Sequence, residues 1–373
     1  MSKKRIALLD RVDSSLFSGG DTVQIQAIYN YLDSQGFKVD IINKFNVDYS
    51  QYDLAILFNL NRPFETYIYS LEVMKYGIPY FLFPIYWDME DVIPREQLST
   101  GINPKKWIPK SIKLSLKPMY YYLIYRSQLK KLGVGITSVH SLKKVINEIL
   151  KNAKLIFPNS VSESNHLIKG FDHKAIENKC IVIKNGIEKR IELPEAMPDH
   201  LKHFLQTKYI CCVGGIGPRK NQLNLVKAVT NLNVNLLIIG EPSNKDINYY
   251  NNLKKIAGNN VYFIGRQDRA TVFSLMANSI GHIQPSFIET PGLASLEAAS
   301  FGIPTIVSDV GPVREYFLNH VIYCNPHSIT SIQESIQSLL NANSKSDQLQ
   351  QFILNNYTWE KVLEPLRYII EKN

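Results

Sequence analysis

Two carboxylates, Glu289 and Glu297, lie eight residues apart on either side of a Pro-Gly step. The short run 280–283 before them predicts a strand, and the apolar spacing from Leu293 onward predicts a helix. Glu289 should therefore follow the carboxyl end of a strand, and Glu297 should lie in the next helix. The first N–H groups of such a helix carry partial positive charge and can bind phosphate or sugar hydroxyls. This pattern suits a polyhydroxylated ligand that carries phosphate, although an isolated pair at this spacing is more often two solvated acids.

A glycine-rich turn lies upstream of these carboxylates, in the run Val213–Lys220. Arg219 and Lys220 stand at the end of this turn, between a predicted strand and a predicted helix, where phosphate-binding charges belong in an α/β fold. The turn has neither the spacing of a P-loop nor a clean G-x-G-x-x-G. By itself it indicates only a turn beside two basic residues. Because the turn lies in the same series of predicted strands and helices as Glu289, we interpret it as part of the same candidate binding site.

That series alternates strands with helices, which is typical of a parallel doubly wound sheet whose ligands bind at the carboxyl edge of the strands. The predicted strands are 209–213, Leu236–Gly240, Val261–Gly265, Ile280–Gln284 and Pro304–Asp309, and the predicted helices are Leu223–Val229, Tyr249–Ile256, Thr271–Ala277 and Leu293–Phe301.

The amino-terminal half has the same architecture with a different sequence. Gly19 and Gly20 form a turn after a first strand and before a helix, and further strands are predicted at Lys38–Ile42, Leu54–Phe58 and Tyr80–Ile85; the first strand is Arg5–Leu9. At this length two domains are expected. The predicted fold class is α/β, with two Rossmann-like parallel-sheet domains facing across a cleft. The predicted domains are residues 1–190, joined by a last helix at 356–373, and residues 191–355.

The ordered set of motifs resembles family 4 of the retaining, nucleotide-sugar-dependent glycosyltransferases, which have the two-domain GT-B fold. Each motif is short, but the set occurs in order across nearly the whole chain. The matching pieces are Gly19-Gly20, Pro158-Asn-Ser160, Lys184-Asn-Gly-Ile187, Val213-Gly followed by Pro-Arg-Lys220, Ile239-Gly240, Phe263-Ile-Gly265, the block from Glu289 to Glu297, Ser308-Asp-Val-Gly311 and Thr358-Trp-Glu360.

The resemblance implies a role for each of these site residues. Glu297 would hold the ribose hydroxyls, Glu289 would contact the donor sugar, and Lys220 would neutralise the diphosphate. The Gly292 and Leu293 amides would support the sugar and the phosphate, Arg266 would line the base, and Gly19 and Gly20 would offer a phosphate-sized backbone opening.

The expected reaction uses fixed protein charge. No Asp-x-Asp metal motif occurs in the chain, so we expect no metal and no cofactor, with Lys220, Arg219 and the helix starts stabilising the diphosphate. The resemblance further implies that the anomeric configuration is retained. Glu289 would bind the sugar and would not attack its anomeric carbon.

Two positions depart from the family pattern. Gly215 stands where many members have an arginine, and Arg219 is the candidate to replace it. The strand end Phe83–Asp88 lacks the histidine that often contacts the donor sugar, so Tyr86, Trp87 or Asp88 would have to serve; His140 is interpreted as structural. These departures leave an alternative open, a non-catalytic nucleotide-sugar-binding subunit of a glycan-assembly complex. A sugar-nucleotide epimerase would share the fold, but the block from Glu289 to Glu297 fits it less well.

Charge is concentrated in one segment of a chain with a net charge of +9. Residues 105–154 contain twelve Lys and Arg and one acid, Glu148, a local charge of +11 that leaves −2 for the rest. The cations alternate with aromatic and aliphatic residues, which favours an anionic membrane surface as a partner. The alternative is a solvated basic face above buried aromatics. Nucleic acid is not expected, because no nucleic-acid-binding fold accompanies the charge.

The remaining features limit where the protein works. The first residues do not form a signal peptide, and no run of about 18 apolar residues suggests a transmembrane helix. The four cysteines show neither metal-site spacing nor a secreted disulfide pattern. We therefore expect a cytoplasmic protein, peripheral at the inner face of the membrane, that acts on a glycan or lipid-linked acceptor in surface polysaccharide or glycolipid assembly.

Overall fold

The structure is a computed structural model that describes residues 4–14, 19–87, 92–94, 97, 110–171, 174–189, 197–230, 232–290, 292–342 and 345–372. The chain divides into two compact units. The first unit contains Met1–Trp87, Pro104–Asn185 and Trp359–Asn373, and the second contains Asp88–Asn103 and Gly186–Thr358.

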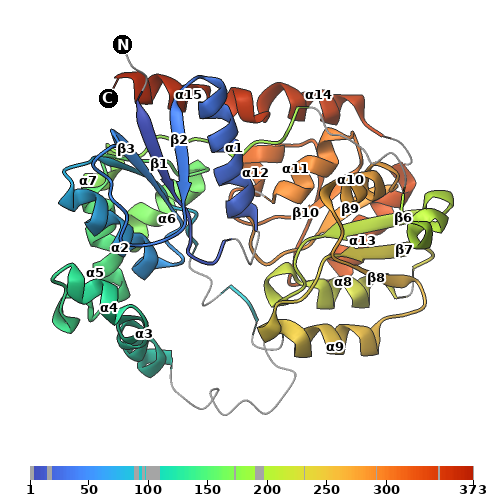
Figure 1. Cartoon of the computed structure of the whole chain (residues 1–373). Helices are drawn as coiled ribbons and strands as arrows, with labels where there is room; N and C mark the ends of the chain where they lie inside the picture. The colour runs from blue at the N-terminus through green and yellow to red at the C-terminus, as the bar shows by residue number, and fades with distance from the viewer. Residues whose placement is uncertain are drawn as a thin grey trace. The chain divides into compact units, whose positions relative to one another are not determined.

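The first unit is built around a five-stranded parallel sheet in the order β2-β1-β3-β4-β5. Figure 1 labels β1, β2 and β3 of this sheet. The chain runs from β1 to β2 on one side and then crosses to β3 on the other. The carboxyl ends of β1 and β3 therefore form the crevice in which ligands bind in such sheets. The strands are β1 (Arg5–Leu9), β2 (Lys38–Ile42), β3 (Leu54–Phe58), β4 (Tyr80–Phe83) and β5 (Leu155–Ile156).

Helices cover this sheet. In α1 the residues Ile25, Ile28 and Leu32 are buried, as their spacing predicts. The last helix of the chain, α15, packs against α1, and Lys4 Nζ donates a 2.9 Å hydrogen bond to Ile370 O. The helical segments are α1 (Gly20–Ser34), α2 (Pro63–Lys75), α3 (Lys110–Ile124), α4 (Arg126–Lys131), η2 (Ile136–Val139), α5 (Leu142–Asn152), α6 (Val161–Phe171), α7 (Lys174–Glu177) and α15 (Trp359–Lys372).

The second unit contains a six-stranded parallel sheet in the order β11-β10-β9-β6-β7-β8. From β6 the chain proceeds outward through β7 and β8, then returns to β9 on the other side of β6. The switch point of this sheet lies between β6 and β9. The strands are β6 (Tyr209–Val213), β7 (Asn235–Ile239), β8 (Val261–Gly265), β9 (Gly281–Gln284), β10 (Thr305–Ser308) and β11 (Ile322–Cys324).

Helices pack against both faces of this sheet. Cys212 and Ile238 pack into one core with α8, α9 and α13, whereas Cys211 and Leu237 pack into another with η3, α10 and α11. The helical segments are η3 (Asp199–Gln206), η4 (Pro218–Lys220), α8 (Gln222–Val229), η5 (Asn244–Asp246), α9 (Ile247–Ile256), α10 (Arg269–Ala277), α11 (Leu293–Ser300), α12 (Val313–Phe317), α13 (Ile329–Ala342) and α14 (Asp347–Asn356).

The predicted fold class, α/β with two Rossmann-like parallel-sheet domains, is confirmed. The predicted strand at Tyr80–Ile85 is too long, because Ile85 has a φ of 45° and cannot continue a strand. The units divide between Asn185 and Gly186, and α15 belongs to the first unit.

Candidate functional site

Lys220 and Glu289 follow neighbouring strands of the second sheet. Lys220 lies in η4, after the glycine turn that ends β6, and Glu289 lies in the loop between β9 and α11. Because β6 and β9 are adjacent, both residues lie at the switch point of the sheet. In sheets of this type the crevice at the switch point binds the ligand.

Three polar side chains lie around the Glu289 carboxylate. Lys220 Nζ lies 2.6 Å from Glu289 Oε1, and Ser286 Oγ donates a 2.7 Å hydrogen bond to the same oxygen. Arg219 Nη1 lies 3.4 Å from that oxygen and also donates a 3.1 Å hydrogen bond to Ile288 O. Glu289 is only 7% exposed. The structure therefore brings together the three residues that the sequence predicted to be catalytic.

Electrostatics keep this carboxylate ionised. Burial by itself would raise the pKa of Glu289, but the charges of Lys220 and Arg219 and the hydrogen bonds from Lys220 and Ser286 lower that pKa to about 2. Two basic side chains therefore face one carboxylate, and burial lowers the pKa of Lys220 while the charge of Glu289 and its hydrogen bond oppose that fall. Such an arrangement can bind an anionic group such as a diphosphate.

The glycine turn after β6 depends on close backbone contact. Gly214 and Gly240 have φ values of 139° and 142°, and a Cβ atom on Gly240 would lie 2.2 Å from Gly214 O. No residue other than glycine fits at position 240. The side chain of Gln222 ties the turn to α8, since it accepts from Gly217 N at 3.3 Å and donates to Gly215 O at 3.2 Å.

The Asn221 side chain joins the loops that follow β9 and β11 through hydrogen bonds. It has a φ of 57°, and its Nδ2 donates to Pro285 O at 2.9 Å and to Pro326 O at 2.8 Å. Gln97 Nε2 donates to Asn221 Oδ1 at 3.2 Å and to Asn224 Oδ1 at 3.1 Å. Sequence patterns singled out neither Asn221 nor Gln97. The preference of asparagine for left-handed backbone could have pointed to Asn221, whereas nothing local marked Gln97.

The start of α11 rests on a buried histidine. Gly292, with a φ of 85°, precedes Leu293 at the first turn of the helix. His282 on β9 is fully buried, and its Nε2 lies 3.1 Å from Ser295 Oγ. Burial, with the nearby charge of Lys220, lowers the pKa of His282 to about 3, so the ring is neutral. A neutral ring can hold this turn without adding charge to the site.

Glu297 is paired with an arginine that the sequence did not predict. Arg269 Nη2, at the start of α10, lies 3.1 Å from Glu297 Oε1. Burial raises the pKa of Glu297 to about 7, while the charge of Arg269 and its hydrogen bond oppose that rise. The Glu297 side chain is 15% exposed, so it can still meet a ligand. No sequence motif marked Arg269, because the pair joins two different helices.

The other predicted binding residues lie elsewhere. Arg266 directly follows β8, two strands from β6 at the same edge of the sheet. Gly19 and Gly20 lie in the first unit, where Gly19 is the N-terminal cap of α1. The structure thus divides the predicted binding residues between the two units.

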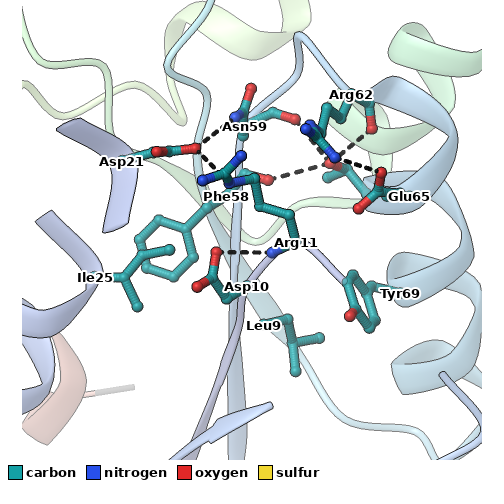
Figure 2. Close-up of a pocket in the computed structure, with 11 residues that line it drawn as sticks. Leu9, Asp10, Arg11, Asp21, Ile25, Phe58, Asn59, Arg62, Glu65 and Tyr69 are labelled. Carbon is teal, nitrogen blue, oxygen red and sulfur yellow. Dashed lines mark hydrogen bonds and ion pairs between the residues drawn. The ribbon is translucent and has the colours of Figure 1, made fainter. Parts of the chain in front are cut away.

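The start of α1 borders a small polar cavity at the carboxyl ends of β1 and β3 (Figure 2). Arg11 Nε lies 3.0 Å from Asp21 Oδ2, and Asn59 Nδ2 donates a 3.1 Å hydrogen bond to the same oxygen. Arg62 Nη1 lies 3.1 Å from Glu65 Oε1. The cavity has a volume of about 10 Å³, which is room for about one water molecule. Its charged groups are already paired, so this cluster ties the start of α1 to the residues that follow β1 and β3.

The run Phe83–Trp87 at the end of β4 lacks a histidine, but a histidine on α6 lies close to it. His166 on α6 stacks on Trp87 at 4.8 Å between ring centroids and lies 5.7 Å from the ring of Tyr86. The fully buried Glu163 accepts hydrogen bonds from Tyr86 N at 2.7 Å and from Asn159 N at 2.6 Å, and burial raises its pKa to about 7. Glu163 therefore fixes the backbone at Tyr86. Asp88, the third candidate at this strand end, lies outside the described residues.

No group of three or more His, Cys, Asp or Glu side chains that could hold a metal ion occurs among the residues that the structure describes. The four cysteines are free. Burial raises the pKa values of Cys211 and Cys212 to about 12, which makes both thiols unreactive at neutral pH.

Part of the chain resembles known proteins in sequence, and nearly all of it resembles solved structures in fold. Residues 194–358 match the family model described as glycosyl transferases group 1. Glycogen synthase of Mycobacterium tuberculosis is 26% identical over 106 residues, which cover 27% of this chain and 26% of the synthase. The match thus spans about a quarter of the length of these curated relatives.

Solved structures match the whole chain. Sucrose-phosphate synthase from Thermosynechococcus elongatus matches with a TM-score of 0.72 and 15% identity over 99% of each chain. HepE of Anabaena in complex with UDP-glucose matches with a TM-score of 0.69 and 14% identity, over 99% of this chain and 100% of HepE. WaaB, a lipopolysaccharide outer core galactosyltransferase, matches with a TM-score of 0.59 and 15% identity, over 99% of this chain and 100% of WaaB. At these identities the matches show the fold alone.

Proposed function

We propose that this chain, which has the GT-B fold and matches the glycosyl transferases group 1 family over residues 194–358, moves a sugar from a nucleotide-sugar donor to a glycan or lipid-linked acceptor. The observation that carries the proposal is the position of Lys220, Arg219 and Glu289 at the switch point of the second sheet. Two cations and a carboxylate there suit a ligand that joins a diphosphate to a polyhydroxylated sugar.

Lys220 and Arg219 would bind the diphosphate. Negative charge on the diphosphate grows as the bond to the sugar breaks, so fixed cations stabilise the transition state more than the ground state. Position 215 lacks the arginine of many family members, but Arg219 already lies 3.4 Å from the carboxylate that Lys220 contacts. This distance supports Arg219 as the second cation of the site.

The remaining groups would bind the rest of the donor. Glu289 would accept hydrogen bonds from the sugar hydroxyls, and Glu297 would accept them from the ribose. The Gly292 and Leu293 amides, at the start of α11, would support the sugar and the phosphate, and Arg266 would line the base. HepE was solved with UDP-glucose, so a uridine diphosphate sugar is the first donor to test.

We propose retention of the anomeric configuration. The acceptor hydroxyl would attack the anomeric carbon from the face that the diphosphate leaves, and the bond between that carbon and the diphosphate oxygen would break. The departing phosphate oxygen would take the proton of the acceptor hydroxyl. Glu289 is a poor covalent nucleophile, because Lys220, Arg219 and Ser286 already hold its carboxylate.

The experiment is donor hydrolysis and transfer with a panel of nucleotide sugars, in EDTA and with added magnesium or manganese. We expect one donor to turn over in EDTA and its product to retain the anomeric configuration by NMR. Complete loss in EDTA that a metal restores would contradict the metal-free mechanism, and an inverted product would contradict retention.

A second candidate function remains, a nucleotide-sugar-binding subunit without catalysis. The glycine at position 215 and the absence of a histidine in the run Phe83–Trp87 favour it. Binding of a nucleotide sugar without hydrolysis or transfer, across the donor panel and with candidate glycan acceptors, would favour this candidate over the enzyme. Surface polysaccharide or glycolipid assembly is the proposed setting for either function.

A further inference from the structure

Helix α3 exposes a row of large apolar side chains. Five residues spaced at three and four positions fall on one face of this helix. Each is between 44% and 62% exposed, and together we call them the α3 stripe: Leu116, Met119, Tyr120, Leu123 and Ile124. The other large apolar residues that are exposed in the described part of the chain are scattered over many elements.

The opposite face of the same helix is already packed against the first unit. Tyr122 is 7% exposed, and Tyr121 stacks on Phe64 at 5.4 Å between ring centroids. Just beyond the helix, Tyr125 Oη donates a 2.8 Å hydrogen bond to Glu65 Oε1. These contacts fix the rotation of α3, so the α3 stripe faces outward in the folded unit. A group of adjacent exposed apolar side chains of this kind marks an interaction surface.

The surroundings of the α3 stripe are basic. Helix α3 packs against α4 and η2, and η2 packs against α5. Arg126, Lys130 and Lys131 on α4 are exposed, as are Lys143 and Lys144 on α5. The segment 105–154 carries twelve cations and one acid. Figure 1 shows α3 at the outer edge of its unit, beyond α4 and away from the strands.

We propose that the α3 stripe docks on an anionic membrane leaflet, with its apolar side chains in the headgroup region and the cations of α4 and α5 against the lipid phosphates. Interfacial helices combine these two features, an apolar face that enters the boundary layer and cations that attract anionic lipid. None of the described helices has the length and apolar character to span a bilayer. The proposal therefore concerns a surface contact.

Charge and apolar character together decide which partner fits the α3 stripe and the cations around it. A second copy of the chain would bring a charge of the same sign against the first, which disfavours association. Nucleic acid would satisfy the cations but would leave the α3 stripe without a partner. An anionic bilayer satisfies both features, and this contact does not require the proposed transferase activity.

The test is co-sedimentation of the full chain with vesicles made of equal parts phosphatidylcholine and phosphatidylglycerol, compared with vesicles of phosphatidylcholine alone. We expect binding only to the anionic vesicles, and only at low salt, because salt screens the attraction. A triple variant, Leu116→Ser, Tyr120→Ser and Leu123→Ser, should lose binding. The double variant Lys130→Ser and Lys131→Ser should bind roughly thirtyfold more weakly.

Matched controls use exposed residues elsewhere. Ile247→Ser and the pair Lys254→Ser and Lys255→Ser, all on α9 of the second unit, should bind vesicles like the wild type. Wild-type protein that ignores anionic vesicles at low salt would overturn the proposal. A wild-type dimer that the triple variant converts to a monomer, without vesicle binding, would assign the surface to a second copy. If the triple variant bound anionic vesicles as tightly as the wild type, the attraction would come from charge alone, which would also overturn the proposal.

Discussion

Lys220 Nζ and Glu289 Oε1 are 2.6 Å apart although the two residues are 69 positions apart in the chain. The contact exists because β6 and β9 are neighbours in the sheet, so the loops that follow them meet. It keeps the carboxylate ionised and the ammonium group in place before any donor arrives. Groups that are fixed in advance need little rearrangement when charge develops during a reaction.

The first prediction concerns stability. The folded pKa of Glu289, about 2, lies below its ordinary value of 4.5, so its stabilisation is complete above about pH 4.5 and is lost as the pH falls toward 2. Glu289→Gln should lower the free energy of unfolding by about 3 kcal/mol at neutral pH, because it leaves Lys220 buried without its counter-ion. The difference between wild type and variant should shrink in acid.

Thermal unfolding at neutral pH and in acid measures this difference. Glu334→Gln, on the exposed surface of α13, is the matched control and should behave like the wild type at both pH values. A gap between wild type and Glu289→Gln that stays constant as the pH falls would contradict the ion pair.

The second prediction concerns donor binding and pH. Because the pKa of Glu297 is raised to about 7, the carboxylate is ionised above that pH and protonated below it. Nucleotide-sugar affinity should therefore weaken by up to about tenfold between pH 8 and pH 6, since the diphosphate diester of the donor does not itself titrate in this range. Glu297→Ala should weaken binding at pH 8 by about ten- to a hundredfold, the value of a charge-assisted hydrogen bond, and should remove the pH dependence.

Arg269 provides the decisive variants, measured by titration calorimetry. Loss of its charge in Arg269→Ala should move the midpoint of the pH dependence upward, because nothing then opposes the rise that burial causes in the pKa of Glu297. Glu188 is the acid whose charge adds to that rise. Arg269→Lys should keep the midpoint near that of the wild type. An unchanged midpoint in Arg269→Ala would show that another group titrates.

The third prediction concerns the glycine turn. Gly240→Ala would place a Cβ 2.2 Å from Gly214 O at a φ of 142°, so the turn beside Lys220 must shift. Overpacking of this kind costs about 1–3 kcal/mol, and donor affinity should fall as well. Gly215→Ala is the control, because the nearest atom to its Cβ would be 3.8 Å away. Equal melting temperatures for the two variants would contradict the close contact.

Much of the fold could be predicted because buried parallel strands are apolar runs bounded by turns. The bounds of Arg5–Leu9, Lys38–Ile42, Leu54–Phe58 and Val261–Gly265 are those observed. Helix ends were less accurate, since α10 begins at Arg269, two residues before the predicted start, where Asp268 accepts a hydrogen bond from Thr271 N. A capping side chain decides such an end, and apolar spacing does not reveal it.

The site was predictable only where residues stand next to the strand ends. Topology then brings Lys220 and Glu289 together, and each could be named from its own loop. Arg269 and Gln97 contact partners that are distant in sequence, so no local pattern marks them. Asn221 also contacts distant partners, and only its preference for left-handed backbone could have pointed to it. The orientation of α3 could not be predicted either, because a helix with apolar residues on two faces does not indicate which face is buried.

The most direct test of the proposed reaction is the turnover of Lys220→Ala with the donor that the panel identifies. If Lys220 stabilises the departing diphosphate, kcat should fall by about 10²- to 10³-fold, while the donor Kd changes much less. Glu289→Gln should retain part of the activity, and Lys227→Ala, on the exposed side of α8, should match the wild type. Unchanged turnover in Lys220→Ala would contradict the account.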